Sequence, residues 1–290
     1  MIGEIAALTA AGIWAFSAIA YDKVLVQVNI SGALISLYRG LVSLPFFSLS
    51  LLLFDPVFPI LTGEQWIFLG LSAMLGITVG DTAFFLSLQY VGVRKALLLQ
   101  TLTPLFSAIF AWIFLQEQVS IYGLCGIPLT LLGLVWVITE RTTAQPSVHL
   151  LRGTLLGIFS CATQGLGAIL LKHVLNNSDL TSLWSSSLRM AFGTILLSLW
   201  LLSRKELSFS ILSIPQWRWV ASGAFGGSFI GLWLHQTAFK FASVGIASTL
   251  LTTSPLFSLG VSLSLKEHIS RRATVGALIT VIGISLLFIE

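Results

Sequence analysis

Charged residues are scarce in this sequence, and their scarcity excludes an ordinary soluble domain. Only 9% of the 290 residues are Asp, Glu, Lys or Arg, whereas a soluble domain carries about 25%. Hydrophobic residues make up 56% of the chain, and the mean hydropathy is +0.96. Too little polar surface remains to keep such a chain in water, so we expect an integral membrane protein.

Cysteines and catalytic motifs are also scarce. The two cysteines, Cys125 and Cys161, give neither zinc-ligand spacing nor a disulfide framework. The sequence has no P-loop, which argues against an ATP-driven pump. Gly80-Asp81 is similar to the Gly-x-Gly-Asp motif of intramembrane aspartyl proteases, but Thr78 stands where the first Gly belongs and no second intramembrane Asp is present. We therefore expect no enzyme activity, no metal, no cofactor and no nucleic-acid partner.

Long apolar runs, in contrast, fill the chain. Each is about long enough to cross a hydrocarbon core of ~30 Å. Membrane spans are predicted at residues 3–21, 32–54, 66–88, 95–115, 121–139, 153–172, 182–202, 217–240, 245–265 and 272–289.

The chain repeats itself at an offset of about half its length. Gln65-Trp66 returns as Gln216-Trp217, and Arg39 returns as Arg189. Each half contains five predicted spans, so the second half must enter the membrane in the opposite direction. The sequence therefore predicts an all-α membrane protein of ten transmembrane helices, built as two inverted five-helix repeats, an arrangement that supports alternating access. The predicted repeats are residues 1–140 and 153–290, joined by a loop at 141–152.

Basic residues are distributed unequally between alternate loops. One set of loops carries eleven Lys and Arg, the other set carries only Lys172 and Lys240, and two arginines lie inside spans. The positive-inside rule places the richer set in the cytoplasm and both termini outside, in the cell (inner) membrane of a prokaryote. The eleven residues are Lys23, Arg94, Lys95, Arg141, Arg152, Arg204, Lys205, Arg218, Lys266, Arg271 and Arg272.

Two long segments carry a family resemblance. Residues 104–137 read PLFSAIFAWIFLQEQVSIYGLCGIPLTLLGLVWV, and residues 255–288 read PLFSLGVSLSLKEHISRRATVGALITVIGISLLF. Each has Pro-Leu within a span, a Glu at the end of that span and a glycine-spaced span after it. This order resembles the repeat of the EamA family in the drug/metabolite transporter superfamily, as do residues 80–85 and the turn Tyr90-Val91-Gly92.

The resemblance implies a ten-helix carrier of small solutes such as amino acids, sugars or nucleotides, with a cavity formed by spans 1–4 and 6–9. The chain departs from the family pattern at Glu117, which follows Leu-Gln rather than Leu-Gly. The two halves also differ from each other, because Leu232 stands where the first half has Asp81.

Arg39 and Asp81 are predicted to meet inside the membrane. Each lies seven residues from the end of its predicted span on the same side of the membrane, which is a depth of roughly 10 Å at 1.5 Å per residue. Intramembrane charges are usually paired or functional. The pair is either a structural clamp between two helices, or Asp81 carries a proton or contacts a cationic group of the solute.

Arg189 and His235 are predicted to share a level near the opposite face. They cannot form a salt bridge, and three interpretations remain. His235 is a hydrogen-bonded packing residue, or the neighbouring Arg holds it neutral, or the two residues bind an anionic group together.

Other polar residues are predicted to line the cavity. Glutamine and tryptophan at such positions suit hydrogen bonding to a solute and stacking on it, although polar side chains also join membrane helices to one another. The predicted lining residues besides the four ionisable ones are Trp14, Tyr38, Gln100, Thr101, Thr103, Gln164, Ser187, Trp233, Gln236, Thr252 and Ser254.

Pro104 and Pro255 lie within spans 4 and 9, where proline removes a helical hydrogen bond and kinks the helix. The kinks are moving gates or static bends.

Spans 5 and 10 carry glycines seven residues apart, which predicts close helix contact at the periphery or a dimer surface. Glu117 and Glu267 are predicted to cap or pair at span ends.

The sequence therefore predicts a secondary transporter that moves small polar metabolites, amino acids or related solutes, by alternating access. Proton-coupled export is one form of this prediction. A channel or facilitator is the alternative, and an intramembrane enzyme ranks below both. The predicted partners are a small-molecule solute and the lipid bilayer, with a monomer and a homodimer both left open.

Overall fold

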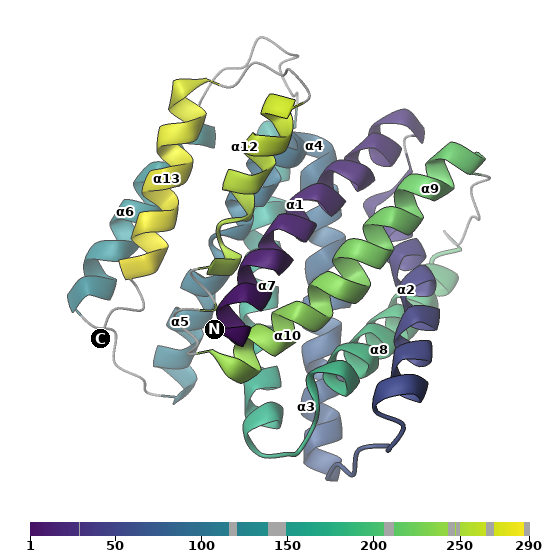
Figure 1. Cartoon of the computed structure of the whole chain (residues 1–290). Helices are drawn as coiled ribbons and strands as arrows, with labels where there is room; N and C mark the ends of the chain where they lie inside the picture. The colour runs from purple at the N-terminus through teal and green to yellow at the C-terminus, as the bar shows by residue number, and fades with distance from the viewer. Residues whose placement is uncertain are drawn as a thin grey trace.

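The computed structural model describes residues 1–28, 30–115, 121–138, 149–205, 212–242, 247, 250–264 and 270–286. These residues form helices joined by short turns, and no strand occurs among them (Figure 1). By length and composition, five helical runs can cross a membrane: Ile2–Leu25, Gly32–Phe54, Gly63–Gln100, Leu150–Asn176 and Ser182–Ser203. The predicted Glu117 and Glu267 caps, and most of the predicted loop 141–152, lie outside the described residues.

The first repeat contains spans 1–5. Span 3 is built from three consecutive elements and ends at Gly92, whose backbone (φ 79°, ψ 166°) leaves the helical region and turns the chain into span 4. Only glycine adopts such a conformation at little cost, as the predicted turn at residues 90–92 requires. The elements are α1 (Ile2–Val28), α2 (Gly32–Phe54), α3 (Gly63–Ala73), η1 (Met74–Asp81), α4 (Thr82–Gln100), α5 (Thr103–Leu115) and α6 (Ile121–Ile138).

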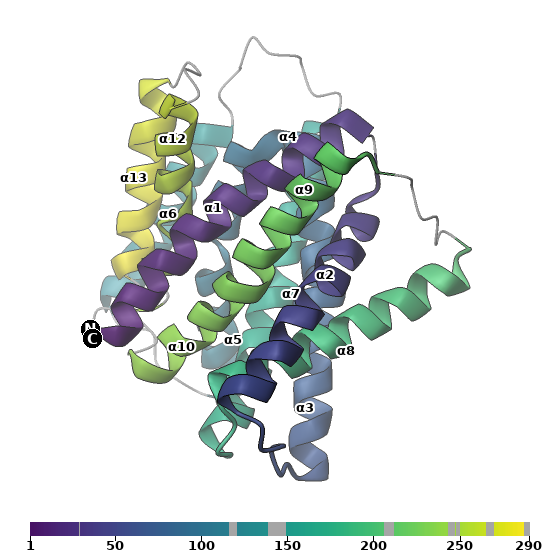
Figure 2. The same cartoon turned by 45° about the vertical axis from the view of Figure 1, so that its right-hand side comes forward.

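The second repeat follows the same order, so the described helices group into the ten predicted spans. In Figure 2, α2 starts on the side where α1 ends, whereas its counterpart α8 starts on the opposite side, where α7 ends. The repeats are therefore inverted. The elements are α7 (Leu150–Asn176), α8 (Ser182–Ser203), α9 (Ile214–Gly223), η2 (Ala224–Gly231), α10 (Leu232–Phe241), α12 (Ser254–Ser264) and α13 (Arg271–Leu286).

The first helix of each repeat packs on the third span of the other repeat. Helix α1 lies along α9, η2 and α10, and helix α7 lies along α3, η1 and α4 (Figure 1). A Cβ atom added at Gly3 would lie 2.6 Å from the backbone nitrogen of Ala242, and one at Gly153 would lie 2.6 Å from the Val91 side chain. These two glycines, 150 residues apart, allow the same close approach twice, and the approach interlocks the repeats.

The repeated Gln-Trp landmark marks the beginning of spans 3 and 8. The side chain of Gln65 accepts a hydrogen bond from the Thr62 N–H at 2.9 Å, and that of Gln216 accepts one from the Ser213 N–H at 2.8 Å. Both glutamines occupy the N3 position of a capping box, which satisfies N–H groups that a helix start leaves unpaired.

Helices α6 and α13 form a peripheral pair beside the rest of the bundle (Figure 1). A Cβ atom at Gly133 would lie 2.7 Å from the Thr280 backbone nitrogen, and one at Gly283 would lie 2.5 Å from the Thr130 backbone nitrogen. The glycines of each helix thus face the threonine of the other. This contact fits the predicted peripheral role, and it occupies the glycine face within one chain rather than leaving it for a second copy.

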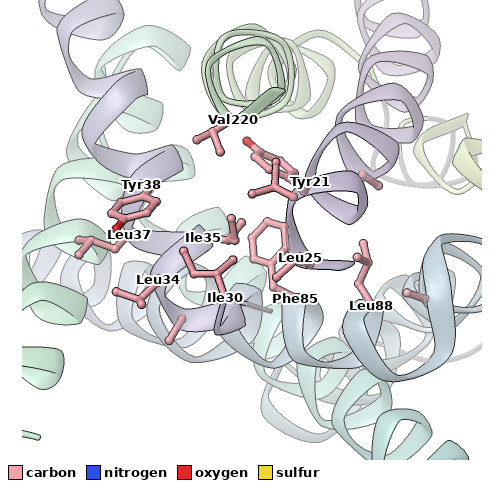
Figure 3. Packing of buried hydrophobic residues seen from close by; sticks show 14 of the residues in the cluster. Tyr21, Leu25, Ile30, Leu34, Ile35, Leu37, Tyr38, Phe85, Leu88 and Val220 are labelled. Atoms are coloured by element: carbon pink, nitrogen blue, oxygen red, sulfur yellow. The ribbon is translucent and has the colours of Figure 1, made fainter. Parts of the chain in front are cut away.

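A large apolar cluster closes the side of the molecule where α1 ends and α2 begins. Tyr21 and Leu25 of α1 meet Ile35 of α2, Phe85 of α4 and Val220 of α9 in this cluster (Figure 3). The Tyr21 and Phe85 rings lie edge to face with centroids 5.1 Å apart. The cluster joins both repeats and excludes water from one side of the polar residues described next.

Candidate functional site

Arg39 and Asp81 form an ion pair inside the helix bundle, as their predicted depths require. Arg39 is on α2, and Asp81 is the last residue of η1. The side chains retain only 11% and 21% of their full exposure. The pair thus joins spans 2 and 3 of the first repeat in a largely water-excluded position.

The ion pair extends into the second repeat through Ser228 of η2. Arg39 donates from Nη1 to the Ser228 Oγ at 3.3 Å, and the Tyr21 hydroxyl shares a 3.4 Å hydrogen bond with the same oxygen. Ser228 is 1% exposed. A serine of the second repeat therefore connects Arg39 with span 1.

On the other side of Asp81, hydrogen bonds lead to spans 4 and 6. Gln164 of α7 donates to the Asp81 Oδ1 at 3.4 Å and to the Ser160 Oγ at 3.0 Å. Gln100 donates to the same Ser160 oxygen at 3.1 Å, and it accepts from Thr103 at 3.1 Å. We call the connected set the central network. Its members are Tyr21, Arg39, Asp81, Gln100, Thr103, Ser160, Gln164 and Ser228.

The π-helical segments η1 and η2 shape this region. In η1 the Gly80 carbonyl accepts a hydrogen bond from Ser160 at 2.7 Å, and in η2 the Gly227 carbonyl accepts one from the Trp14 indole N–H at 3.1 Å. Trp14 and Gln164 are repeat counterparts, 150 residues apart. π-helical turns occur often at functional sites, and here both segments turn backbone oxygens toward a neighbouring repeat.

Arg189 and His235 lie in a second polar region, between α8 and α10. Helices α8 and α10 pack against each other, and the centroid of the His235 ring lies 5.2 Å from that of Trp14. Arg189 is 6% exposed and Gln236 is fully buried. The structure thus places Arg189 and His235 on two helices that contact each other.

Two predicted lining residues contact other aromatic rings. Tyr38 is 1% exposed within the apolar cluster of Figure 3, and its ring lies 5.2 Å from that of Trp217. Trp233 packs near the Phe229 ring, with centroids 6.2 Å apart. Tyr38 thus packs between α2 and α9, whereas Trp233 is only partly buried and contacts a ring of its own span.

The two prolines lie just after breaks in spans 4 and 9. Residues 101–102 and 252–253 are turns, and α5 and α12 begin at Thr103 and Ser254. Pro104 and Pro255 therefore occupy the first turn of a helix, where the missing N–H is tolerated. The break next to Pro104 lies beside Gln100 and so at the edge of the central network.

Sequence reasoning missed three members of the central network: Tyr21, Ser160 and Ser228. Ser160 could have been found, because it precedes Gln164 by four residues on α7 and so lies on the same helix face. No group of three or more His, Cys, Asp or Glu suited to a metal occurs in the described part of the chain. The described residues of the central network present hydrogen-bonding groups and one ion pair.

Comparison with known proteins identifies the same two repeats. The sequence model of the EamA-like transporter family matches residues 1–139 and again residues 151–289. A crystal structure of a protein matches the fold with a TM-score of 0.73, covering 98% of this chain and 97% of that chain at 14% identity. At this identity the match shows the fold alone.

Two relatives are named as transporters. An "uncharacterized transporter" of Archaeoglobus fulgidus is 29% identical over 294 residues, covering all of this chain and 99% of the relative. The "uncharacterized transporter YyaM" of Bacillus subtilis is 26% identical over 223 residues, covering 76% of this chain and 71% of the relative. Both names indicate a transporter rather than an enzyme. With both of its halves matching the family model, the chain belongs to the EamA-like transporter family.

Proposed function

We propose that the protein is a secondary carrier that moves small polar metabolites, amino acids or related solutes, by alternating access. The observation that carries this proposal is the central network, because it joins spans 1–4, 6 and 8 at the contact between inverted repeats. Each repeat can supply the gate on one side of such a site. A carrier also needs a site closed to at least one side, and the apolar cluster around Tyr21 and Phe85 provides that closure.

In this conformation the polar side chains of the central network bond directly to one another. Asp81 is bonded to Arg39 and Gln164, and Ser160 contacts both Gln100 and Gln164. A solute that enters must replace some of these hydrogen bonds with its own. Polar atoms of the solute would then be matched inside the membrane, where unmatched groups are costly, and the solute would be selected by its hydrogen-bonding pattern.

Counterflow distinguishes a carrier from a channel. Proteoliposomes containing the purified protein are loaded with a single unlabelled amino acid and diluted into a trace of the same labelled compound, across a panel of amino acids. A carrier accumulates label transiently above its equilibrium level, because the outward-moving solute returns the site to the outside. Label that only approaches equilibrium, with a rate linear in concentration, would instead support a channel.

We also propose that the protein resides in the inner membrane of a prokaryote with both termini outside, as the distribution of Lys and Arg favours. A reporter active only in the cytoplasm is expected to be silent when fused after Glu290 and active when fused after Arg204. An active fusion at Glu290 would overturn this orientation.

A further inference from the structure

Arg189 lacks the protein partners that its repeat counterpart has. Arg39 forms an ion pair with Asp81 and donates to Ser228. Arg189 stands 150 residues later, at the matching place in α8, and it is more deeply buried in the second repeat, at 6% exposure. Among the described residues it has no ion pair, and its Nε, like that of Arg39, is a buried atom without a hydrogen-bond partner.

Arg189 lacks a counter-ion because of the sequence of span 8. The place that Asp81 holds at the end of η1 is taken at the end of η2 by Gly231 and Leu232, and neither can accept a hydrogen bond through its side chain. One arginine of the pseudo-symmetric pair therefore has a built-in counter-ion and the other does not. A buried guanidinium without a counter-ion requires one from outside the helices that surround it.

Several unpartnered polar groups lie on α8 and α10, the helix of Arg189 and a helix that packs against it. Ser185 precedes Arg189 by one helical turn, where a helical side chain leans, and its buried Oγ has no partner within the described structure. On α10, the same holds for His235 Nδ1 and for both amide atoms of Gln236. The Ser186 hydroxyl donates to the Leu232 carbonyl at 3.4 Å and so holds α8 against α10 at this level.

Space at the guanidinium is provided by Gly76 of η1. A Cβ atom there would lie 2.7 Å from the Arg189 Nη2. Any larger residue at this position would press on the guanidinium. Spans 3 and 7 thus keep one of its donors next to a position without a side chain.

We propose that Arg189 binds the carboxylate of the transported solute, an inference that rests on the proposed carrier function. The planar guanidinium donates two parallel hydrogen bonds to a carboxylate, and Ser185, one helical turn before Arg189, offers a hydroxyl without a partner. One guanidinium balances one negative charge. A phosphate monoester carries about −1.5 to −2 at neutral pH and would leave charge unbalanced, so a monovalent carboxylate fits better.

The test compares matched acids and amides on the full chain purified in detergent. Melting temperatures are measured with acetate and acetamide, lactate and lactamide, and alanine and alaninamide, on the parent protein, Arg189→Met and Arg189→Lys. Arg204→Met is the control, because Arg204 is an exposed arginine at the end of the same helix. We expect at least one acid to stabilise the parent where its amide does not. Arg189→Met should weaken this binding at least tenfold, Arg189→Lys should weaken it less, and Arg204→Met should leave it unchanged.

The melting temperature of the ligand-free protein makes the test independent of folding defects. Because Arg189→Met removes an unbalanced buried charge, we expect it to raise the melting temperature of the ligand-free protein. A lower melting temperature than that of Arg204→Met would mean that the guanidinium is held by the protein itself, and would overturn the proposal. Equal stabilisation by acids and amides, no stabilisation by any acid, or stabilisation by chloride or inorganic phosphate alone would overturn it too.

Counterflow separates this inference from the proposed function. If a neutral solute undergoes counterflow equally well in the parent and in Arg189→Met, the carboxylate inference fails and the carrier stands. If acids bind through Arg189 but no solute undergoes counterflow, the carrier fails and the binding site stands.

Discussion

Asp81→Leu is expected to destabilise the protein by about 3 kcal/mol, because it leaves the buried Arg39 without its counter-ion. Arg39→Leu combined with Asp81→Leu is expected to recover most of this loss, since two matched apolar side chains replace a buried pair at little net cost. The free energy of unfolding of the three variants, measured in the same detergent, checks the prediction. Glu64→Leu, at an exposed acid of the same span, is the control and should change stability by less than about 0.5 kcal/mol.

Transport by the stable double variant decides between the two interpretations of the pair. If Arg39 and Asp81 are only a clamp, the double variant transports at the parent rate. We expect instead at least a tenfold loss, because Asp81 also accepts a hydrogen bond from Gln164 of the other repeat. Asp81→Asn is further expected to abolish any dependence of transport on a proton gradient, and unchanged coupling in that variant would remove the proton-carrier interpretation.

Gly133→Leu is expected to separate α6 from α13 and to lower the melting temperature by roughly 10 °C. A leucine there meets the Thr280 backbone nitrogen, which cannot move aside as a flexible side chain can. Overpacking costs about 1–3 kcal/mol and occasionally more, and a contact with backbone falls at the upper end of this range. Each kcal/mol lowers the melting temperature by ~2–4 °C at this chain length. Differential scanning fluorimetry of the purified protein checks the value.

The control for this variant is Gly70→Leu, on α3. A Cβ atom at Gly70 meets nothing within 4 Å, so the larger side chain has room and the melting temperature should stay within a few degrees of the parent. Gly283→Leu, the counterpart of Gly133→Leu on the other helix, should reproduce the loss. If all three variants melted alike, the glycine contact between α6 and α13 would have no role in stability.

The membrane fold could be predicted because many residues together determine it. Ten apolar runs and a repeat of about 150 residues determine the number and the inversion of the helices, and the described helices agree with both. The depths of Arg39 and Asp81 sufficed to pair them, since a buried charge in a membrane has few alternatives. The π-helical segments were not predicted, because the apolar and small residues of Met74–Asp81 and Ala224–Gly231 also fit an α-helical membrane span.

Within the site, the sequence indicated how deep each residue lies in the membrane but not which way its side chain points. Tyr38 is next to Arg39 in sequence, yet it packs with Trp217 while Arg39 reaches Asp81, because consecutive helical residues point about 100° apart. Ser228 was missed because serines are frequent in these spans and nothing local distinguishes one that meets Arg39 across the repeats. Such contacts depend on how two helices far apart in sequence are rotated against each other.

Distance measurement on both faces of the purified protein tests the central claim of alternating access most directly. One pair of spin labels is placed at Glu64 and Phe241, on the face where span 3 begins and span 8 ends. The other pair is placed at Arg94 and Ile214, on the opposite face, where span 3 ends and span 8 begins. Pulsed electron resonance then gives the distribution of each distance in proteoliposomes. Alternating access predicts two populations for each pair, with conditions that lengthen one distance shortening the other. Single, unchanging distances, or distances that lengthen together, would contradict it.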